Sequence, residues 1–132
     1  MNDDWQGEYE YFRESEMECQ CGCGGLPCDS FMVKLELLRK ELNFPLAVSS
    51  GYRCPSYNEV VAGSGTDGPH TRGIAADFLI WGEHALDLIT IAVARGFTGI
   101  GVKQRGKPSE RFIHLDYVEN SSSHPRPWIW SY

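Results

Sequence analysis

Two long segments repeat apolar residues at the three- or four-residue interval of a helix that buries one face. The first begins next to Asp29 or Ser30, both residue types that cap helix N-termini, and the second is followed by Gly96, a frequent helix terminator. A third, shorter helix is expected to start at Pro55, which suits a first helical turn. Helices are therefore predicted over residues 29–42, 55–61 and 83–95.

Short apolar runs between these helices indicate strands. The predicted strands lie within residues 45–52, 74–81, 96–104 and 110–118. The last two are separated by RGKPS, whose turn-forming residues predict an antiparallel hairpin. The tail, residues 121–132, is expected to be a polar loop that ends in aromatic residues.

The order of these elements predicts an α+β fold, a small antiparallel sheet with packed helices. The 132 residues suffice for one domain with a buried core, so residues 1–132 are expected to form a single domain. Residues 1–18 are acidic and aromatic without a clear period, and are expected to form an N-terminal arm packed on the body. A Gly-rich loop at residues 62–73 precedes the second predicted strand.

The charge balance narrows the possible partners. With 12 Lys and Arg against 18 Asp and Glu, the net charge of -6 has the wrong sign for binding nucleic acid through its phosphates. No window approaches the apolar length of a membrane span. The start, MNDDWQGEYEYFRESE, lacks both the basic and the apolar region of a signal peptide, so synthesis in the cytoplasm is expected. Separately, we expect the protein to be a monomer.

The cysteines allow more than one state. Four of the five fall within CQCGCGGLPC, and the odd total fits either thiols with a small metal site or up to two disulfides with one thiol left over. The C-x-C-x-C-x4-C spacing departs from the paired C-x2-C of common zinc sites. This difference favours a turn held together by its cysteines over a metal site at these residues. The five residues are Cys19, Cys21, Cys23, Cys28 and Cys54.

Two histidines and an aspartate are candidates for a metal site. His70 lies near the end of the Gly-rich loop, Asp77 on the strand after it and His114 in the last predicted strand, while Gly73 allows a tight turn between the first two. Two imidazoles and one carboxylate suit zinc, and three protein ligands leave the fourth tetrahedral position open for water, as in catalytic sites. The H-x6-D pattern alone is loose, because single His and Asp residues more often have structural roles.

A carboxylate near the last histidine is the candidate general base. Side chains alternate along a strand, so Glu110, Phe112, His114 and Asp116 share one face. A residue two positions from a ligand lies about 7 Å away, close enough to reach a metal's water or to hold the ligand ring. Asp116 is the first candidate for the base, with Glu110 in reserve.

An arginine is the candidate for substrate binding. Arg53 lies in SSGYRCP at a strand-to-loop junction, where its guanidinium can pair bidentately with a ligand carboxylate. The pattern alone favours the alternative, an arginine paired with an internal acid.

Four motifs, SGYRCPSYN, GPHTRGIAADF, GFTGIGV and RFIHLDY, follow one another in an order that resembles the zinc D-Ala-D-Ala carboxypeptidases and endopeptidases of bacterial cell-wall peptides. That family belongs to a wider group with lysostaphin-type peptidases and the hedgehog signalling domain. The likeness runs from about residue 19 to residue 130, including the C-x-C-G-C-G start and the RPWIW end. It implies zinc binding by His70, Asp77 and His114, and substrate binding by Arg53.

The chain departs from this family at two positions. The family commonly has a serine two residues before the first zinc histidine, where this chain has Gly68, so a polar contact is missing or comes from Thr66 or Thr71. Many relatives have an acidic base three residues before the last histidine, where this chain has Arg111. Asp116 is therefore expected to act as the base.

The resemblance implies a zinc peptidase that hydrolyses stem peptides or cross-links of bacterial peptidoglycan. In such an enzyme Zn²⁺ lowers the pKa of a water molecule and polarises the scissile carbonyl, while an acidic side chain moves the proton. A wall peptidase without a signal peptide is expected to be encoded by a phage or prophage and to act at the bacterial cell wall. Trp128 and Trp130 could flank the groove, although aromatic residues near a C-terminus more often pack on the core.

Two other function classes stay open. One is a hedgehog-like zinc-binding or wall-binding module without turnover, and the other is a cysteine-rich metal or redox protein. The sequence also leaves open carboxypeptidase or endopeptidase action, and a D,D or an L,D bond.

Overall fold

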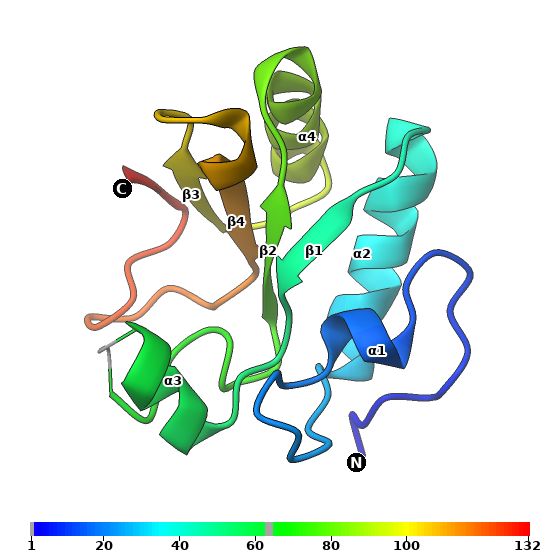
Figure 1. Ribbon diagram of the computed structural model, residues 1–132, viewed down its shortest axis with the longest axis vertical. Coiled ribbons are helices and arrows are strands. Elements are labelled where there is room, and N and C mark those ends of the chain that lie inside the picture. Colours follow the sequence, from blue (N-terminus) through cyan, green and yellow to red (C-terminus); the bar gives the residue numbers. More distant parts are fainter. Residues whose placement is uncertain (1, 63–64) are drawn as a thin grey trace.

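The computed structural model describes residues 2–62 and 65–132, and this part of the chain has the predicted α+β architecture (Figure 1). Its five strands form one sheet in the order β1-β2-β4-β3-β5. The strands are β1 (Ala47–Ser50), β2 (Ala75–Leu79), β3 (Gly99–Lys103), β4 (Phe112–Asp116) and β5 (Trp128–Ser131). The helices are α1 (Glu14–Met17), α2 (Asp29–Leu42), α3 (Pro55–Ala62), α4 (Gly82–Ala94) and the 3-10 helix η1 (Pro108–Glu110).

The sheet is antiparallel except where β5 pairs with β3 in parallel. Its register aligns one residue from each strand in a row across the sheet: Ser50, Asp77, His114, Gly101 and Trp130. The adjacent row on the same face runs through Ala75, Asp116, Gly99 and Trp128. The candidate site residues Asp77, His114 and Asp116 therefore lie in two neighbouring rows on one face of the sheet.

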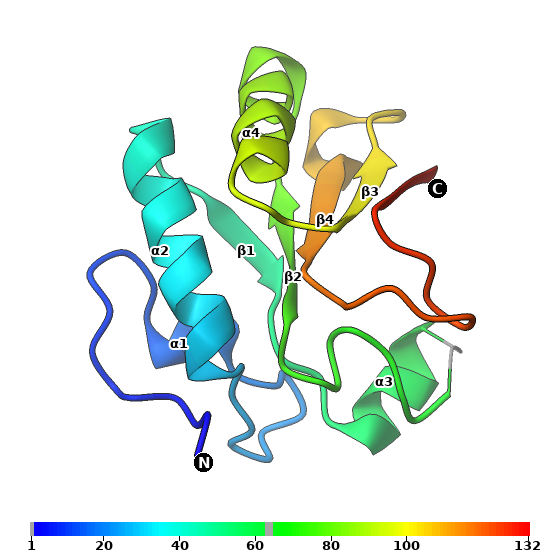
Figure 2. The ribbon, with the colours of Figure 1, turned by 180° about the vertical axis from the view of Figure 1, so that it is seen from behind.

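The opposite face of the sheet forms the core. Residues that alternate with the candidate site along β2 and β4 are fully buried, namely Ala76, Phe78, Ile113 and Leu115. They pack against the apolar faces of α2 and α4, which Figure 2 shows on one side of the sheet. Burial of this apolar surface drives the folding of the sheet and leaves its other face for polar residues.

The N-terminal arm contributes to this core and to the start of α2. Phe12 and Met17 are buried in the main cluster. The Tyr9 hydroxyl donates a hydrogen bond to the Asp29 carboxylate in the first turn of α2. Burial, with this hydrogen bond, raises the pKa of Tyr9 to about 12.

The cap of α2 differs from the prediction. The N-cap residue is Cys28, not Asp29 or Ser30, and its side chain makes no cap hydrogen bond. The arm supplies the acceptors instead: the Asp3 carbonyl accepts the Asp29 N–H at 2.9 Å, and Asp3 Oδ1 accepts the Ser30 N–H at 2.9 Å. A cap from a distant segment leaves no local pattern in the sequence.

The other predicted elements are present up to the tail, whereas the short helices α1 and η1 have no counterpart in the prediction. All three predicted helices and the β3–β4 hairpin are confirmed, and Gly96 follows α4 with a φ of 84°. The prediction of a loop throughout the tail is wrong for β5, whose parallel pairing with β3 depends on a contact distant in sequence. No helix in the described part of the chain is long and apolar enough to cross a bilayer.

Candidate metal centre

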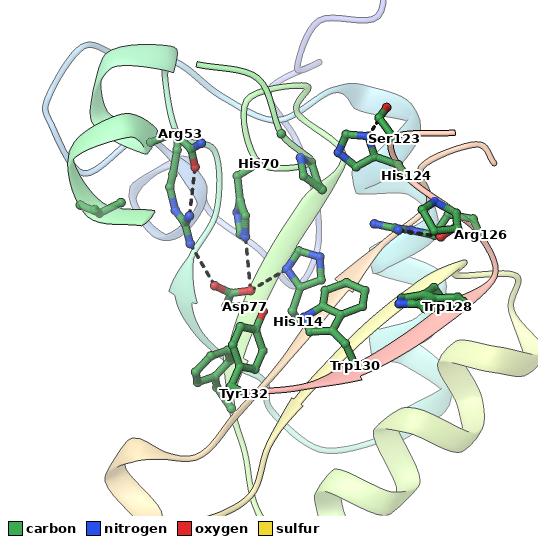
Figure 3. Close-up of a pocket in the computed structure, with 16 residues that line it drawn as sticks. Arg53, His70, Asp77, His114, Ser123, His124, Arg126, Trp128, Trp130 and Tyr132 are labelled. Atoms are coloured by element: carbon green, nitrogen blue, oxygen red, sulfur yellow. Dashed lines mark hydrogen bonds and ion pairs between the residues drawn. The ribbon is translucent and has the colours of Figure 1, made fainter. Parts of the chain in front are cut away.

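His70, Asp77 and His114 come together on the polar face of the sheet (Figure 3). Each offers one ligand atom, and these atoms all lie within 4.8 Å of one another. The Asp77 Oδ1 atom lies 3.3 Å from His70 Nε2 and 3.0 Å from His114 Nδ1. All three residues are buried, with exposed fractions of 8 % or less.

His70 is positioned by the loop before β2. Gly73 has a φ of 76°, and an added Cβ there would lie 2.9 Å from Cys28 Sγ, so a larger residue would strain this turn. The His70 Nδ1–H donates to the Gly51 carbonyl at 2.8 Å. This bond fixes the tautomer and leaves Nε2 free to face Asp77.

His114 is fixed from the opposite side of its ring. Its Nε2–H donates to Asp116 Oδ2 at 2.8 Å, so Nδ1 faces Asp77. Burial alone would lower the pKa of His114, but the hydrogen bonds with Asp116 and Asp77 raise it above its ordinary value. Burial alone would likewise raise the pKa of Asp77, but hydrogen bonds from His114 and His70 hold it well below its usual range.

This donor set fits a zinc ion. Each imidazole already uses one nitrogen on an outer partner, and both remaining nitrogens point at the same carboxylate oxygen. Two ring nitrogens directed at one anionic oxygen require a proton or a cation between them. Two histidines and one aspartate, each histidine held by an outer hydrogen bond, are a usual zinc ligand set.

Asp116, the predicted base, is completely buried. Its carboxylate accepts bonds from His114, from Arg126 Nε at 3.0 Å and Nη2 at 2.8 Å, and from the Val118 backbone N–H at 3.2 Å. Burial would raise the pKa of Asp116, but the bonds from His114 and Arg126 hold it at about 2. The base role stays a prediction, and this geometry favours a carboxylate that orients His114.

Arg53 lies beside Asp77 on the cavity wall. Its Nε donates to Ser50 Oγ at 2.9 Å, Nη1 to Asn58 Oδ1 at 3.1 Å and Nη2 to Asp77 Oδ2 at 3.1 Å. Among the residues that the structure describes, these bonds use three of the five guanidinium N–H donors, which leaves two for a ligand. Arg53 thus pairs with an internal acid and also faces the cavity.

A cavity of about 650 Å³ opens over the three candidate ligands. Its wall includes side chains that the sequence interpretation did not assign to the site: Asn58 from α3, and Ser123, His124, Arg126 and Tyr132 from the tail. Asn58 is buried in α3, five residues after Arg53, and accepts a hydrogen bond from the Arg53 guanidinium. The tail residues are found only through the β3–β5 pairing.

The tail tryptophans line this cavity, contrary to the expectation that they pack on the core. The Trp130 ring lies 5.1 Å from the His114 ring between centroids, and Trp128 is 54 % exposed. Trp130 fits because its row partner on β3 is a glycine: an added Cβ on Gly101 would lie 2.7 Å from Trp130 Nε1.

Several predicted alternatives lie outside the cavity wall. Glu110 belongs to η1, where its carboxylate accepts the Lys107 backbone N–H at 3.1 Å. Arg111 donates to the Gly106 carbonyl at 3.0 Å. Gly68, in contrast, lines the cavity. The Thr71 hydroxyl accepts a hydrogen bond from the Gly68 backbone N–H at 2.7 Å and donates one to the Gly68 carbonyl at 2.8 Å. Thr66 is exposed.

Comparison with known proteins gives one finding. A family model described as Peptidase M15 matches residues 10–116, most of the chain, including all three candidate ligands and Arg53. No curated protein shows a significant match to the chain.

Proposed function

This chain belongs to the peptidase M15 family, whose members are zinc-dependent, and we propose that it hydrolyses peptide bonds in the stem peptides or cross-links of bacterial peptidoglycan. We further propose that it acts at the cell wall as a phage-type or prophage-type enzyme. The net charge of -6 is compatible with this proposal. The carboxylate of a small peptide can bind to one nearby cation, and acidic groups far from that cation are screened by salt.

One observation carries the proposal: three buried ligands converge at the floor of a cavity whose wall also holds an arginine. His70, Asp77 and His114 would hold the zinc ion. When bound there, zinc lowers the pKa of a water molecule and polarises a carbonyl group for attack. An open cavity beside the ligands gives a peptide access to this chemistry.

Arg53 supplies the cation of the proposed substrate site. Arg53 and Asp77 both line the cavity and contact each other, so a substrate carboxylate held by Arg53 would lie close to the metal ligands. The bonds to Ser50, Asn58 and Asp77 fix the guanidinium before substrate arrives and reduce the entropy lost on binding.

Asp116 and Arg126 form the support behind His114. The Arg126 side chain, 5 % exposed, donates to both oxygens of Asp116, and Asp116 accepts a hydrogen bond from the His114 ring. We propose that this chain of contacts holds the His114 Nδ1 lone pair toward the metal position. In this role Asp116 is a positioning residue.

The experiment that tests the function is digestion of purified muropeptides with the zinc-loaded protein, followed by mass spectrometry. Cross-linked dimers that separate into monomers indicate endopeptidase action, and pentapeptides that lose one terminal D-Ala indicate carboxypeptidase action. Arg53→Ala is expected to raise KM at least about tenfold, because a charge-assisted bidentate contact is lost. Arg105→Ala, at an exposed site outside the cavity wall, is the matched control.

The alternative functions predict other outcomes. A hedgehog-like module without turnover would bind zinc at His70, Asp77 and His114 and cleave no wall peptide under any condition. A cysteine-rich metal or redox protein would lose its metal on substitution of the cysteines and keep it in His114→Ala.

A further inference from the structure

A second group of metal-ligating side chains lies outside the cavity. It consists of Cys19, Cys21 and Cys23 from the loop between α1 and α2, and Cys54 from the turn between β1 and α3. The four Sγ atoms all lie within 4.8 Å of one another. Cys28, although close in sequence, is separate, and its thiol donates to the Arg72 carbonyl at 3.3 Å.

The sulfur separations match a single tetrahedral ion. Four sulfurs placed tetrahedrally at the usual zinc–sulfur distance of about 2.3 Å lie about 3.8 Å apart. The Cys19 and Cys21 sulfurs are 3.3 Å apart, and those of Cys21 and Cys54 are 3.6 Å apart. None of the five cysteines, all within the described part of the chain, is in a disulfide. These separations are much longer than the S–S bond of a disulfide, about 2.05 Å, and the four sulfurs form one group instead of two bonded pairs.

The backbone is built around this group. Gly22 and Gly24 alternate with the cysteines and have φ angles of 86° and 82°, a conformation that side-chain-bearing residues rarely adopt. The Gly22 N–H donates to the Cys19 carbonyl at 3.2 Å, which closes a turn that brings Cys21 back toward Cys19. The alternation thus lets three cysteines of a five-residue stretch present their sulfurs to one point.

A backbone N–H also reaches one of the sulfurs. The Cys54 N–H donates to Cys19 Sγ at 3.3 Å, and Cys19 is 1 % exposed. Thiolate ligands in metal sites are oriented by such outer hydrogen bonds. A buried sulfur that accepts an N–H and lies within 4.8 Å of three other sulfurs is held in place to act as a metal ligand.

From these contacts we propose that Cys19, Cys21, Cys23 and Cys54 bind a second zinc ion, which has a structural role. Four protein ligands close the coordination shell and leave no position for substrate water. The sequence spacing argued against this site because Cys54, the fourth ligand, is 31 residues from Cys23 and replaces Cys28 in the set.

The second ion would fasten the loop between α1 and α2 to the turn that carries Arg53. Cys54 directly follows Arg53, so a metal held by residues 19–23 and Cys54 would anchor the turn that carries the guanidinium. Gln20 already bridges the same segments, donating to the Ser49 carbonyl at 2.8 Å and accepting from the Tyr57 hydroxyl at 3.2 Å.

The test is metal analysis of the full chain, purified under reducing conditions, for the wild type and three variants. We expect about two zinc ions per wild-type chain, one fewer in Cys23→Ser, and no change in Cys28→Ser, the matched control. His114→Ala should lose the other ion, so failure of the cysteine site and failure of the peptidase site are distinguishable. Zinc content equal to wild type in Cys23→Ser would overturn the proposal, as would iron in place of zinc.

A second measurement leaves the cysteines intact in case Cys23→Ser does not fold. His114→Ala loaded with Co²⁺ should show intense near-ultraviolet thiolate-to-cobalt absorption, because sulfur ligands give charge-transfer bands that nitrogen and oxygen ligands lack. Absence of this absorption, or an intact mass that is lower by two hydrogens per disulfide, would contradict the four-thiolate site.

Discussion

At the scale of single residues, the site is defined by the partners behind its ligands. The Gly51 carbonyl and the Asp116 carboxylate each take one imidazole N–H, so the two rings present opposite nitrogens, Nε2 and Nδ1, to Asp77. Neither partner lies in the H-x6-D pattern. That His70, Asp77 and His114 come together was predictable from the sequence, whereas the tautomers of the two histidines depend on the folded sheet.

Asp116→Asn tests whether this carboxylate positions His114 or acts as the base. As a positioning residue, its loss should weaken zinc binding about 10- to 100-fold, and hydrolysis should recover when zinc is added in excess. Competition with a fluorescent zinc chelator measures the affinity. Asp67→Asn, at an exposed carboxylate paired with Arg72, should change neither property.

A base role for Asp116 gives a different result. Zinc affinity would then stay close to that of the wild type, while hydrolysis would be lost at every zinc concentration. That outcome would return the role of general base to Asp116.

At the scale of elements, strand β3 is shaped by what lies beside it. Gly99 and Gly101 occupy the two rows of the site, and their missing side chains make room for Asp116 and Trp130. Between them, Ile100 points into the core. The GFTGIGV motif therefore encodes a strand with apolar side chains on one face and glycines on the other, where neighbouring side chains fill the space.

Gly99→Ala should destabilise the fold, because the added Cβ would overlap the carboxylate of the fully buried Asp116. Overpacking of this kind costs about 1–3 kcal/mol, to be measured by urea unfolding. Gly68→Ala is the control, since its Cβ would lie 3.7 Å from Asn58 Nδ2, an ordinary contact. Equal stability of the two variants would show that β3 can move away from β4.

The contact between the arm and α2 should make stability depend on alkaline pH. The pKa of Tyr9 is about 12 in the folded protein against an ordinary 10.0, so the neutral phenol is favoured by folding. Its contribution is complete below about pH 10 and is lost as the pH rises toward 12. The difference in unfolding free energy between wild type and Tyr9→Phe should shrink over that range, and a constant difference would contradict the contact.

The elements also show how far sequence patterns reach. Helices α2 and α4 and the β3–β4 hairpin were predictable because their apolar period and turn residues are local. The cap of α2 by Asp3, the strand β5 and the place of Cys54 beside the other three cysteines were missed, since each depends on segments far apart in the sequence.

At the scale of the whole molecule, the candidate metal site joins the loop that carries His70 to strands β2 and β4, which the core already holds together. The core packs α2 and α4 on one face of the sheet, whereas the polar face is joined through His70, Asp77 and His114. Tail residues reach this face through the bonds of Arg126 to Asp116. Metal binding should therefore contribute to global stability as well as to chemistry.

Removal of zinc by a chelator should lower the unfolding temperature. Free zinc at about a thousand times its Kd adds about 4 kcal/mol of stability to a protein that binds it only when folded. Differential scanning calorimetry with EDTA and with added zinc measures the shift, and Mg²⁺ in place of zinc is the control. A wild-type melting temperature that is the same in EDTA and in zinc would contradict metal binding by the folded state.

The row through Ser50, Asp77, His114, Gly101 and Trp130 has a further consequence for how the chain reaches one structure. Because side chains alternate, a slip of one residue between β2 and β4 would turn His114 into the apolar core and bring Ile113 or Leu115 to the ligand position. Such a misaligned sheet could not bind the metal. Zinc binding would thus select the native strand register, since only sheets paired in that register gain its binding free energy.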